Sequence, residues 1–395
     1  MRIRYLLMHA FGMGGTIRTV INQANAMARL GHQVELVSAV RRRDSPQFPL
    51  DPRVAVVSLV DQRGQIPKEQ RRTLRHRVLA RLRPGIVPRG EYASSWFTWR
   101  VESAVVQYVS KLTDGILVTT RPALNILAAH AAPKGVILVA QEHMNLASHR
   151  DDVRAAIVRL YPRFHAVVVL TNTDRSDYEK VLPGTRIVRI PNSVHSLDQR
   201  HTRHTGKTVI AAGRLVAQKG FDLLIPAFER VVAAHPDWKL RIYGTGPKKT
   251  ELRALIEDYE LGKNISLMGR TDHFDDRLAK ASMFVLSSRF EGLPMVMIEA
   301  MSHALPVVSF DCPTGPADVI TDGVDGVLVP PEDVEALGAA MIRLIDDKEL
   351  RRRLGEAAVT TVKKYASGVI MPRWEALFAD LPGPVSFPDS IGSQD

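Results

Sequence analysis

Short apolar runs alternate with segments of helical periodicity along most of the sequence, and this alternation is the feature that most constrains the fold. The first series of predicted strands comprises Ile3–His9, Val34–Ser38, Gly115–Thr119, Gly135–Ala140 and Ala166–Thr171. The second series comprises Thr208–Ala212, Leu240–Tyr243, Ile265–Met268, Met283–Ser287 and Pro306–Ser309. Amphipathic helices are predicted between them, among them Thr16–Leu30, Phe221–Ala234, Lys248–Glu260 and Val334–Ile345. Near-continuous apolar strands separated by such helices indicate parallel sheets covered on both faces, so we expect two doubly wound, Rossmann-like α/β domains.

A polar gap separates the two series and sets the expected domain boundaries. The expected parts are an N-terminal domain (1–192), a linker (193–206), a C-terminal domain (207–370), a helix that packs back toward the N-terminal domain (371–381) and a disordered tail (382–395). The gap contains three histidines, but we interpret it as a solvated linker rather than a metal site. Prolines with Gly and Ser make the tail typical of disordered segments.

Charge is distributed unevenly between the two halves. Residues 1–200 hold 30 Lys and Arg against 15 Asp and Glu, whereas residues 201–395 hold 23 against 27. The N-terminal half is therefore predicted to meet something anionic, such as nucleic acid, a membrane surface or a phosphorylated substrate. Within it, segment 68–89 combines many arginines with leucines at helical spacing. That pattern fits a basic helix on anionic lipid, and it fits equally a solvated helix that packs on its own domain.

Cysteine content and hydropathy bear on the compartment. Cys312 is the single cysteine, which excludes an intramolecular disulfide and fits a reducing interior. No run of apolar residues approaches the ~18 that a membrane-spanning helix needs. We expect a cytoplasmic protein, with peripheral association at the inner face of the membrane through 68–89 as an open alternative. The sequence carries no expectation of the oligomeric state.

A glycine-rich loop follows the first predicted strand and opens the first helix. Gly12, Gly14 and Gly15 would let backbone amides approach a phosphate at the helix N-terminus. The dinucleotide-binding pattern G-x-G-x-x-G is incomplete, because Ile17 occupies its last position. A tight turn without a ligand is the alternative interpretation.

A second loop between strand and helix carries two cations. Arg214 and Lys219 lie between the strand Thr208–Ala212 and the helix Phe221–Ala234. Arg can bind a phosphate through two hydrogen bonds and Lys acts as a point charge, so this pair suits a diphosphate.

Two glutamates follow a strand in the second series. Glu291 is expected in the loop after Met283–Ser287, and Glu299 on an apolar, buried helix that begins near Pro294. A buried carboxylate needs hydrogen-bond donors, which ribose or sugar hydroxyls supply. Eight residues span at most ~12 Å along a helix, roughly the distance from a ribose to the sugar of a nucleotide-sugar. The alternative is that both are structural, one at a helix terminus and one in an ion pair.

The start of this helix is also expected to bind phosphate. The backbone amides predicted to point toward a diphosphate are those of Gly292, Leu293 and Met295.

Together these features resemble family 4 of the retaining glycosyltransferases, which have the GT-B fold. The resemblance rests on Gly213-Arg214, Gln218-Lys219-Gly220, Glu291 and Glu299. It extends over nearly the whole chain and implies two Rossmann-like domains that face each other across a cleft, the first binding the acceptor and the second the nucleotide-sugar donor. Arg214 and Lys219 would then bind the donor diphosphate. Glu291 would contact the hydroxyls of the donor sugar and Glu299 the ribose.

The resemblance also implies roles for residues outside these motifs. Gly14 and Gly15 would close over the phosphates near the acceptor. His143 follows the strand Gly135–Ala140, where family members often carry a histidine that contacts the donor sugar near the reacting centre. A capping or buried loop histidine is the alternative for that position. Gly269 and Arg270 would lie against the nucleotide base.

We therefore expect a hexosyltransferase that moves a hexosyl or N-acetylhexosaminyl group to an acceptor hydroxyl with an α-linked product. UDP-sugars are favoured as donors over GDP- or ADP-sugars, because the stretch Pro306–Pro316 is similar to that of the UDP-sugar subset. No metal is expected, since no D-x-D motif occurs in the sequence and Arg214 and Lys219 can stabilise the leaving diphosphate. No cofactor is expected either. An anionic polymer, lipid-linked glycan or polysaccharide is the expected acceptor, in cell-wall or glycan synthesis.

Three other functions would place different demands on this sequence. A nucleotide-sugar or nicotinamide oxidoreductase or epimerase would need the complete glycine pattern. A phosphorylase of similar fold uses phosphate as acceptor, but the pyridoxal-binding motif of the glycogen phosphorylases is missing. A nucleic-acid-binding protein would use the basic half, but no helix-turn-helix, zinc site or aromatic-studded sheet supports it, so no nucleic acid is expected as partner.

Overall fold

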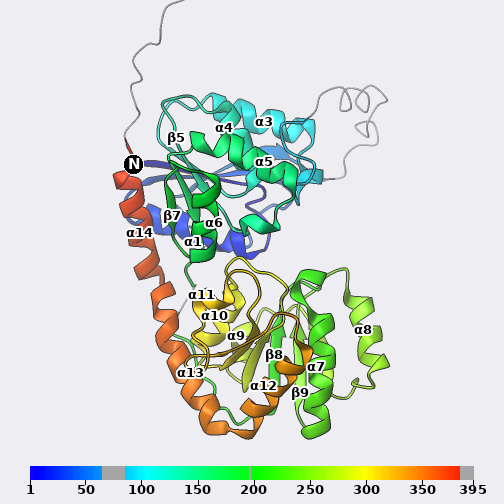
Figure 1. Cartoon of the computed structure of the whole chain (residues 1–395). Coiled ribbons are helices and arrows are strands. Elements are labelled where there is room, and N and C mark those ends of the chain that lie inside the picture. Colours follow the sequence, from blue (N-terminus) through cyan, green and yellow to red (C-terminus); the bar gives the residue numbers. More distant parts are fainter. Residues whose placement is uncertain (65–84, 195–196, 383–395) are drawn as a thin grey trace, which may run out of the picture. The chain divides into compact units, whose positions relative to one another are not determined.

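The computed structural model describes residues 1–64, 85–194 and 197–382, which divide into two compact units. Unit 1 comprises Met1–Ile190 and Met371–Asp395, and unit 2 comprises Pro191–Ile370. Each unit is a parallel sheet with helices packed against it (Figure 1). This confirms the predicted class, two doubly wound α/β domains. Residues 68–84 of the basic segment and 383–395 of the expected tail lie outside the described residues.

Unit 1 contains a seven-stranded sheet in the order β3-β2-β1-β4-β5-β6-β7. Its strands are β1 (Arg2–Leu7), β2 (Gln33–Arg41), β3 (Ala55–Asp61), β4 (Ile116–Thr119), β5 (Ile137–Gln141), β6 (Ala166–Val169) and β7 (Ile187–Arg189). Its helices are α1 (Gly15–Arg29), α3 (Trp99–Ser110), α4 (Pro122–Ala131), α5 (Asp151–Leu160) and α6 (Asn172–Val181). Side chains of α3, α4 and α5 join those of the sheet in one apolar core. The central strands are buried along nearly their whole length, as expected for a sheet covered on both faces.

Unit 2 contains a six-stranded sheet in the order β10-β9-β8-β11-β12-β13. Its strands are β8 (Thr208–Ala212), β9 (Lys239–Tyr243), β10 (Ile265–Gly269), β11 (Met283–Leu286), β12 (Val307–Phe310) and β13 (Val327–Val329). Its helices are α7 (Phe221–Ala234), α8 (Lys249–Asp258), α9 (Phe274–Leu278), α10 (Met295–Ser302), α11 (Pro316–Val319), α12 (Val334–Asp346) and α13 (Lys348–Val362). Side chains of α7, α8, α12 and α13 complete the apolar core of this unit.

The predicted strands are all present, with ends shifted by a few residues, but three strands were missed. β7 and β13 are three residues long, too short to give a pattern in the sequence. β3 lies at the edge of its sheet and is mostly exposed or half-buried, so its apolar run is not continuous.

The helix α14 (Ser367–Asp380) ends the described chain, and its residues from Met371 onward belong to unit 1. Asp380 forms an ion pair with Arg186 at 2.5 Å. Arg373 donates to the backbone carbonyl of Arg189 at 2.5 Å. These contacts attach the end of the chain to the region around β7.

Part of the segment 193–206, which was predicted to be a solvated linker, packs against unit 2. Ser193, Val194, Thr202 and His204 are buried, and the segment belongs to unit 2. The backbone amide of Thr202 donates to the carbonyl of His303 at 2.9 Å. The segment therefore packs along unit 2 through backbone hydrogen bonds, which a polar sequence does not reveal.

The sheet order identifies where each unit can bind a ligand. In unit 2 the order reverses between β8 and β11, and in unit 1 between β1 and β4. Open parallel sheets bind ligands beyond the carboxyl ends of the strands at such a reversal. Among the helices of the described ranges, none has both the length and the apolar character needed to cross a membrane.

Candidate functional site

The loop that follows β8 is held against the loop that follows β11 by contacts that require a glycine. Gly220 has a φ of +60°, and a Cβ at this position would lie 1.9 Å from the carbonyl oxygen of Ser287. The hydroxyl of Ser287 donates to the carbonyl of Lys219 at 3.0 Å, and the amide of Arg289 donates to that of Gln218 at 2.8 Å. The two loops on either side of the reversal are thus joined along their backbones.

Lys219 and Glu291 meet at this junction. The Lys219 ammonium lies 2.5 Å from Glu291 Oε1, and the Ser288 hydroxyl donates to the same oxygen at 2.6 Å. The two side chains are only 15% and 7% exposed. A buried ammonium paired with a buried carboxylate, at the edge where ligands bind, can act on a bound molecule through both charges.

Arg214 lies in the same loop but is arranged differently. Its side chain is exposed and forms no hydrogen bond or ion pair with any part of the chain that the structure describes. Between the two cations, Leu215 is buried and its amide donates to the carbonyl of Thr245 at 3.0 Å. The loop therefore presents one cation to solvent and holds the other on a carboxylate.

The start of α10 differs from the expectation at one amide. Met295 already donates its N–H to the carbonyl of Leu293 at 2.9 Å. Within the described ranges, the amides of Gly292 and Leu293 have no hydrogen-bond partner. Those two amides, and not that of Met295, are available to an anion.

Glu299 lies on α10 and is half-buried, with its helix otherwise packed through apolar side chains. Because α10 begins at Met295, the stretch from Glu291 to Glu299 is only partly helical. The distance along a continuous helix therefore does not apply to the whole stretch between them. Glu299 also has interactions within the protein.

Gly269 and Arg270 end the outermost strand of this sheet, β10. Gly269 has a φ of +70°, and its carbonyl accepts from the amide of Gly244 at 2.8 Å. Arg270 is exposed, with Asp272 at 3.3 Å. This places both residues two strands away from β8.

In unit 1 the glycine loop connects β1 to α1. Gly14 and Gly15 are exposed, and a Cβ on either would meet nothing within 4 Å. The position that requires glycine is Gly12, where a Cβ would lie 2.9 Å from Cδ2 of His9 and 3.0 Å from Cδ1 of Ile17. Gly14 and Gly15 therefore leave the backbone open at the start of α1, while Gly12 shapes the turn.

His143 follows β5, as predicted, and its imidazole is unsatisfied. Neither ring nitrogen has a hydrogen-bond partner among the described residues, and both are shielded from solvent. Burial, followed by the charge of Arg121, lowers the pKa of His143 to about 4. A neutral imidazole carries one donor and one acceptor, and buried polar atoms of this kind are normally paired. An unpaired pair of nitrogens at the carboxyl end of a strand is suited to a ligand with hydroxyl groups.

The neighbouring Glu142 is a polar group that the sequence analysis did not single out. Its carboxyl is buried, and it accepts hydrogen bonds from the hydroxyl of Tyr161 and, at 2.7 Å, from the amide of Asn125. Burial, opposed by these hydrogen bonds, raises the pKa of Glu142 to about 7. Glu142 directly follows β5, Tyr161 lies in η4 (Tyr161–Arg163) and Asn125 lies in α4, and only the tertiary structure brings the three together.

Known proteins are similar to this chain in sequence and in fold. Residues 196–361 match the family model described as glycosyl transferases group 1, within unit 2. An exopolysaccharide phosphotransferase of Streptomyces coelicolor is 35% identical over 391 residues, 96% of this chain and 41% of that protein. A poly(ribitol-phosphate) alpha-N-acetylglucosaminyltransferase of Staphylococcus aureus is 30% identical over 289 residues, 69% of this chain and 58% of that protein. The structure of S. aureus TarM with fondaparinux, alpha-GlcNAc-glycerol and UDP has a TM-score of 0.77 at 19% identity, over 95% of this chain and 99% of that one.

The chain has the GT-B fold of known glycosyltransferases, and residues 196–361 match the group 1 glycosyl transferases. It spans about two fifths of the length of the Streptomyces relative. The family match falls within unit 2, which contains Lys219 and Glu291.

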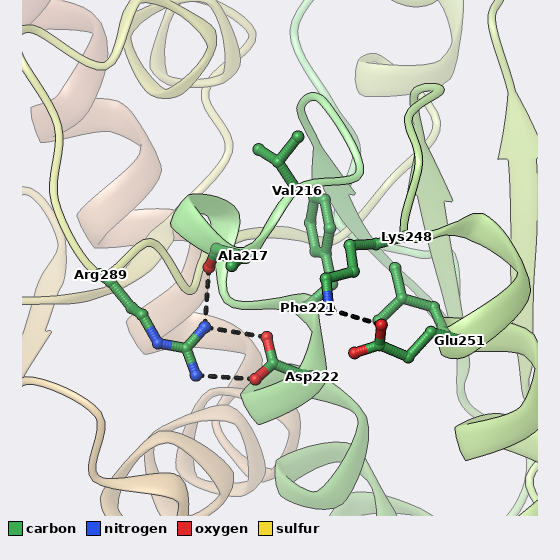
Figure 2. Close-up of a pocket in the computed structure, with 8 residues that line it drawn as sticks. Val216, Ala217, Phe221, Asp222, Lys248, Glu251 and Arg289 are labelled. Carbon is green, nitrogen blue, oxygen red and sulfur yellow. Dashed lines mark hydrogen bonds and ion pairs between the residues drawn. The ribbon is translucent and has the colours of Figure 1, made fainter. Parts of the chain in front are cut away.

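A second arginine of the same unit stabilises the loop that carries Lys219. Arg289 forms two hydrogen bonds with Asp222, at 2.9 and 2.7 Å, and a third with the carbonyl of Ala217 at 2.7 Å (Figure 2). The adjoining hollow has a volume of only about 90 Å³. Ligand pockets usually have ~300–1,000 Å³, so this hollow is too small for a nucleotide-sugar and Arg289 acts on the loop instead.

No group of three or more His, Cys, Asp or Glu side chains in the described ranges is arranged to hold a metal ion.

Proposed function

We propose that this glycosyltransferase is a retaining enzyme of family 4 that uses a UDP-sugar. It moves a hexosyl or N-acetylhexosaminyl group to an acceptor hydroxyl and forms an α-linked product without a metal ion. The acceptor is an anionic or lipid-linked polymer or polysaccharide, as in cell-wall or exopolysaccharide synthesis. The observation that carries the proposal is the buried Lys219–Glu291 pair at the reversal of the sheet, beside the exposed cation Arg214.

The residues of unit 2 take the donor in this proposal. Arg214 and Lys219 bind the diphosphate, with the amides of Gly292 and Leu293 as further donors. Glu291 accepts hydrogen bonds from the hydroxyls of the donor sugar. Glu299 accepts from the ribose.

The residues around the base and the acceptor are assigned through the resemblance. Gly269 and Arg270 lie against the base. Gly14 and Gly15 approach the phosphates, and the neutral imidazole of His143 exchanges hydrogen bonds with a hydroxyl of the donor sugar.

The reaction breaks the bond between the anomeric carbon and the β-phosphate oxygen. The sugar passes through an oxocarbenium-like state, and the acceptor oxygen forms the new bond on the face that the phosphate leaves. The acceptor proton moves to the departing phosphate, so the products are the glycoside and UDP. The cations and amides that hold the diphosphate stabilise the charge that develops on it.

Ligand-induced stabilisation tests the donor. UDP, GDP and ADP are each added to the full chain, and the melting temperature is recorded, since a ligand that binds only the folded state raises it. We expect the largest rise with UDP, its loss in Lys219→Ala and its retention in Lys263→Ala, which removes an exposed lysine of the same unit. No rise with any of the three nucleotides would overturn the proposal.

The released nucleotide tests the reaction. Glycosyl transfer from a UDP-sugar releases UDP, whereas transfer of a sugar phosphate releases UMP. We expect UDP, and an anomeric configuration in the product that is the same as in the donor. Release of UMP would assign the chain to phosphotransfer, the activity for which the Streptomyces relative is named.

A further inference from the structure

A cavity in unit 1 lies along the edge strand β3 and reaches the carboxyl ends of β2 and β3. Its volume is about 450 Å³, and it is lined by Phe11, Arg41, Pro46, Val56, Ser58 and Asp61. Phe11 belongs to the glycine loop after β1, and Arg41 pairs in register with Asp61 at the ends of their strands. We call it the arginine pocket. Its size falls in the ~300–1,000 Å³ range of ligand pockets, and it lies at the edge of the sheet where ligands bind.

The guanidinium of Arg41 is fixed in this pocket. It lies over the ring of Phe11, 4.8 Å from the centroid, and donates to the carbonyls of Arg43 at 3.2 Å and Asp44 at 2.6 Å. These contacts use two of its five N–H groups. The positive charge of Arg41 is therefore fixed in position, and its remaining N–H groups can donate to a ligand.

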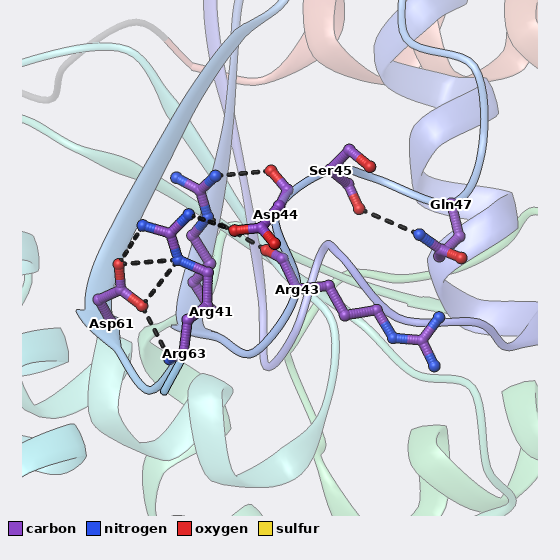
Figure 3. Close-up of polar contacts among 7 residues, drawn as sticks. All are labelled: Arg41, Arg43, Asp44, Ser45, Gln47, Asp61 and Arg63. Carbon is purple, nitrogen blue, oxygen red and sulfur yellow. Dashed lines mark hydrogen bonds and ion pairs between the residues drawn. The ribbon is translucent and has the colours of Figure 1, made fainter. Parts of the chain in front are cut away.

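The two carboxylates near Arg41 are bound to a different arginine. Arg63 forms hydrogen bonds of 2.6 to 3.0 Å with Asp61 and one of 2.8 Å with Asp44 (Figure 3). Hydrogen bonds from Arg63 lower the pKa of Asp61 to about 2, so it stays ionised near neutral pH. Because Arg63 occupies both carboxylates, they do not compete for the remaining arginines.

Two further arginines follow Arg41 directly. Arg42 stacks on Trp96, 3.5 Å from the ring centroid, and donates to the side chain of Gln62 at 2.9 Å. Arg43 is exposed and extends away from the network in Figure 3, without a side-chain partner in the ranges that the structure describes. Four arginines against Asp44 and Asp61 leave an excess of two positive charges at the pocket.

We infer that the arginine pocket binds a phosphate group of the acceptor, a phosphodiester-linked polyol or glycan chain. Arg41 in the pocket lining and the exposed Arg43 close to it in the chain supply the forked donors that match phosphate oxygens, and Ser58 exchanges hydrogen bonds with hydroxyls between the phosphates. A pocket with an excess of positive charge beside it suits a chain with spaced anions better than it suits the flat face of a membrane. The inference rests on the proposed function, because it names the acceptor of that reaction.

A binding assay without a donor tests the inference. A fluorescent glycerol-phosphate oligomer is titrated with the full chain, and an uncharged oligosaccharide of similar length serves as the comparison ligand. We expect Arg43→Ala to weaken binding of the oligomer about tenfold, as for loss of one charge-assisted hydrogen bond. Arg159→Ala removes an equally exposed arginine from α5 and should leave the affinity unchanged.

A substitution that removes a negative charge, instead of a positive one, controls for a general effect of substitution on folding. Asp61→Asn removes a negative charge from the pocket wall and should tighten binding of the oligomer severalfold, most clearly at low salt. Equal affinities for Arg43→Ala and Arg159→Ala would overturn the inference. So would equal affinities for the charged and uncharged ligands, or binding to anionic lipid vesicles with none to the oligomer.

The same variants separate this inference from the proposed function. Arg43→Ala should retain the rise in melting temperature caused by UDP, because the arginine pocket belongs to unit 1 and Lys219 to unit 2. A wild-type chain that binds the oligomer but not UDP would contradict the proposed function alone. One that binds UDP but not the oligomer would contradict the inference alone.

Discussion

The Lys219 ammonium lies 2.5 Å from a carboxylate oxygen of Glu291, a residue 72 positions further along the chain. A diphosphate that binds Lys219 must therefore share the ammonium with Glu291. A sugar that binds Glu291 contacts a carboxylate that already carries a hydrogen bond from this ammonium. The pair couples the phosphate and sugar ends of the proposed donor.

This coupling should be measurable in the free protein. Lys219→Met and Glu291→Gln each leave the partner charge buried without its counterion, which we expect to lower the free energy of unfolding by about 2–4 kcal/mol. The double variant Lys219→Met/Glu291→Gln removes both charges and should cost clearly less than the sum of the two. Urea denaturation of all four proteins measures the coupling, and additive losses would show that the pair does not interact.

Gly220 should be intolerant of a side chain. Gly220→Ala would place a Cβ 1.9 Å from the carbonyl of Ser287 in a backbone conformation that disfavours alanine. We expect the Lys219 loop to shift, with loss of the UDP-induced rise in melting temperature and a lower free energy of unfolding. Gly262→Ala is the matched control, because a Cβ there meets nothing within 4 Å. Similar behaviour of the two variants would contradict the assignment of Gly220 as a contact point between the loops.

Glu142 should make stability depend on pH. Its pKa is raised to about 7 in the folded protein from a model-peptide value of 4.5. The folded state thus binds this proton more tightly than the unfolded state, and the stabilisation present below pH 4.5 is lost as pH rises toward and through 7. Glu142→Gln keeps a neutral group, so above pH 7 it should be more stable than the wild type by on the order of 2–3 kcal/mol. Urea denaturation between pH 4.5 and 8.5 tests this, and curves that stay parallel would refute it.

His143 should be dispensable for folding and needed for transfer. Its two unpaired ring nitrogens carry a desolvation cost, so His143→Phe should unfold at an equal or slightly higher urea concentration than the wild type. Turnover of the UDP-sugar should fall at least about tenfold, the typical loss for one hydrogen bond of ~1.4 kcal/mol in the transition state. A destabilised but fully active variant would identify His143 as a structural residue.

Several parts of the fold and of the site follow from local patterns. The strand Thr208–Ala212 and the helix Phe221–Ala234 were predicted with the boundaries that the structure has, because their apolar spacing and flanking turn residues are local. The positions of Lys219 and His143 after strands were also readable. In a parallel sheet every strand ends at the same edge, so a residue that follows a strand lies there whatever the strand order.

Tertiary structure alone decided which of these residues meet. Lys219 pairs with Glu291 and Arg214 does not. The reason is that Gly220 packs one end of the loop against Ser287, directly after β11. The Glu142 cluster assembles from three elements whose sequence signals concern only their own periodicity. Sequence by itself determined the elements, the sheet type and the loops that carry charge, because these depend on neighbouring residues. The order of the strands and the pairing of side chains depend on packing between distant segments, which no local pattern encodes.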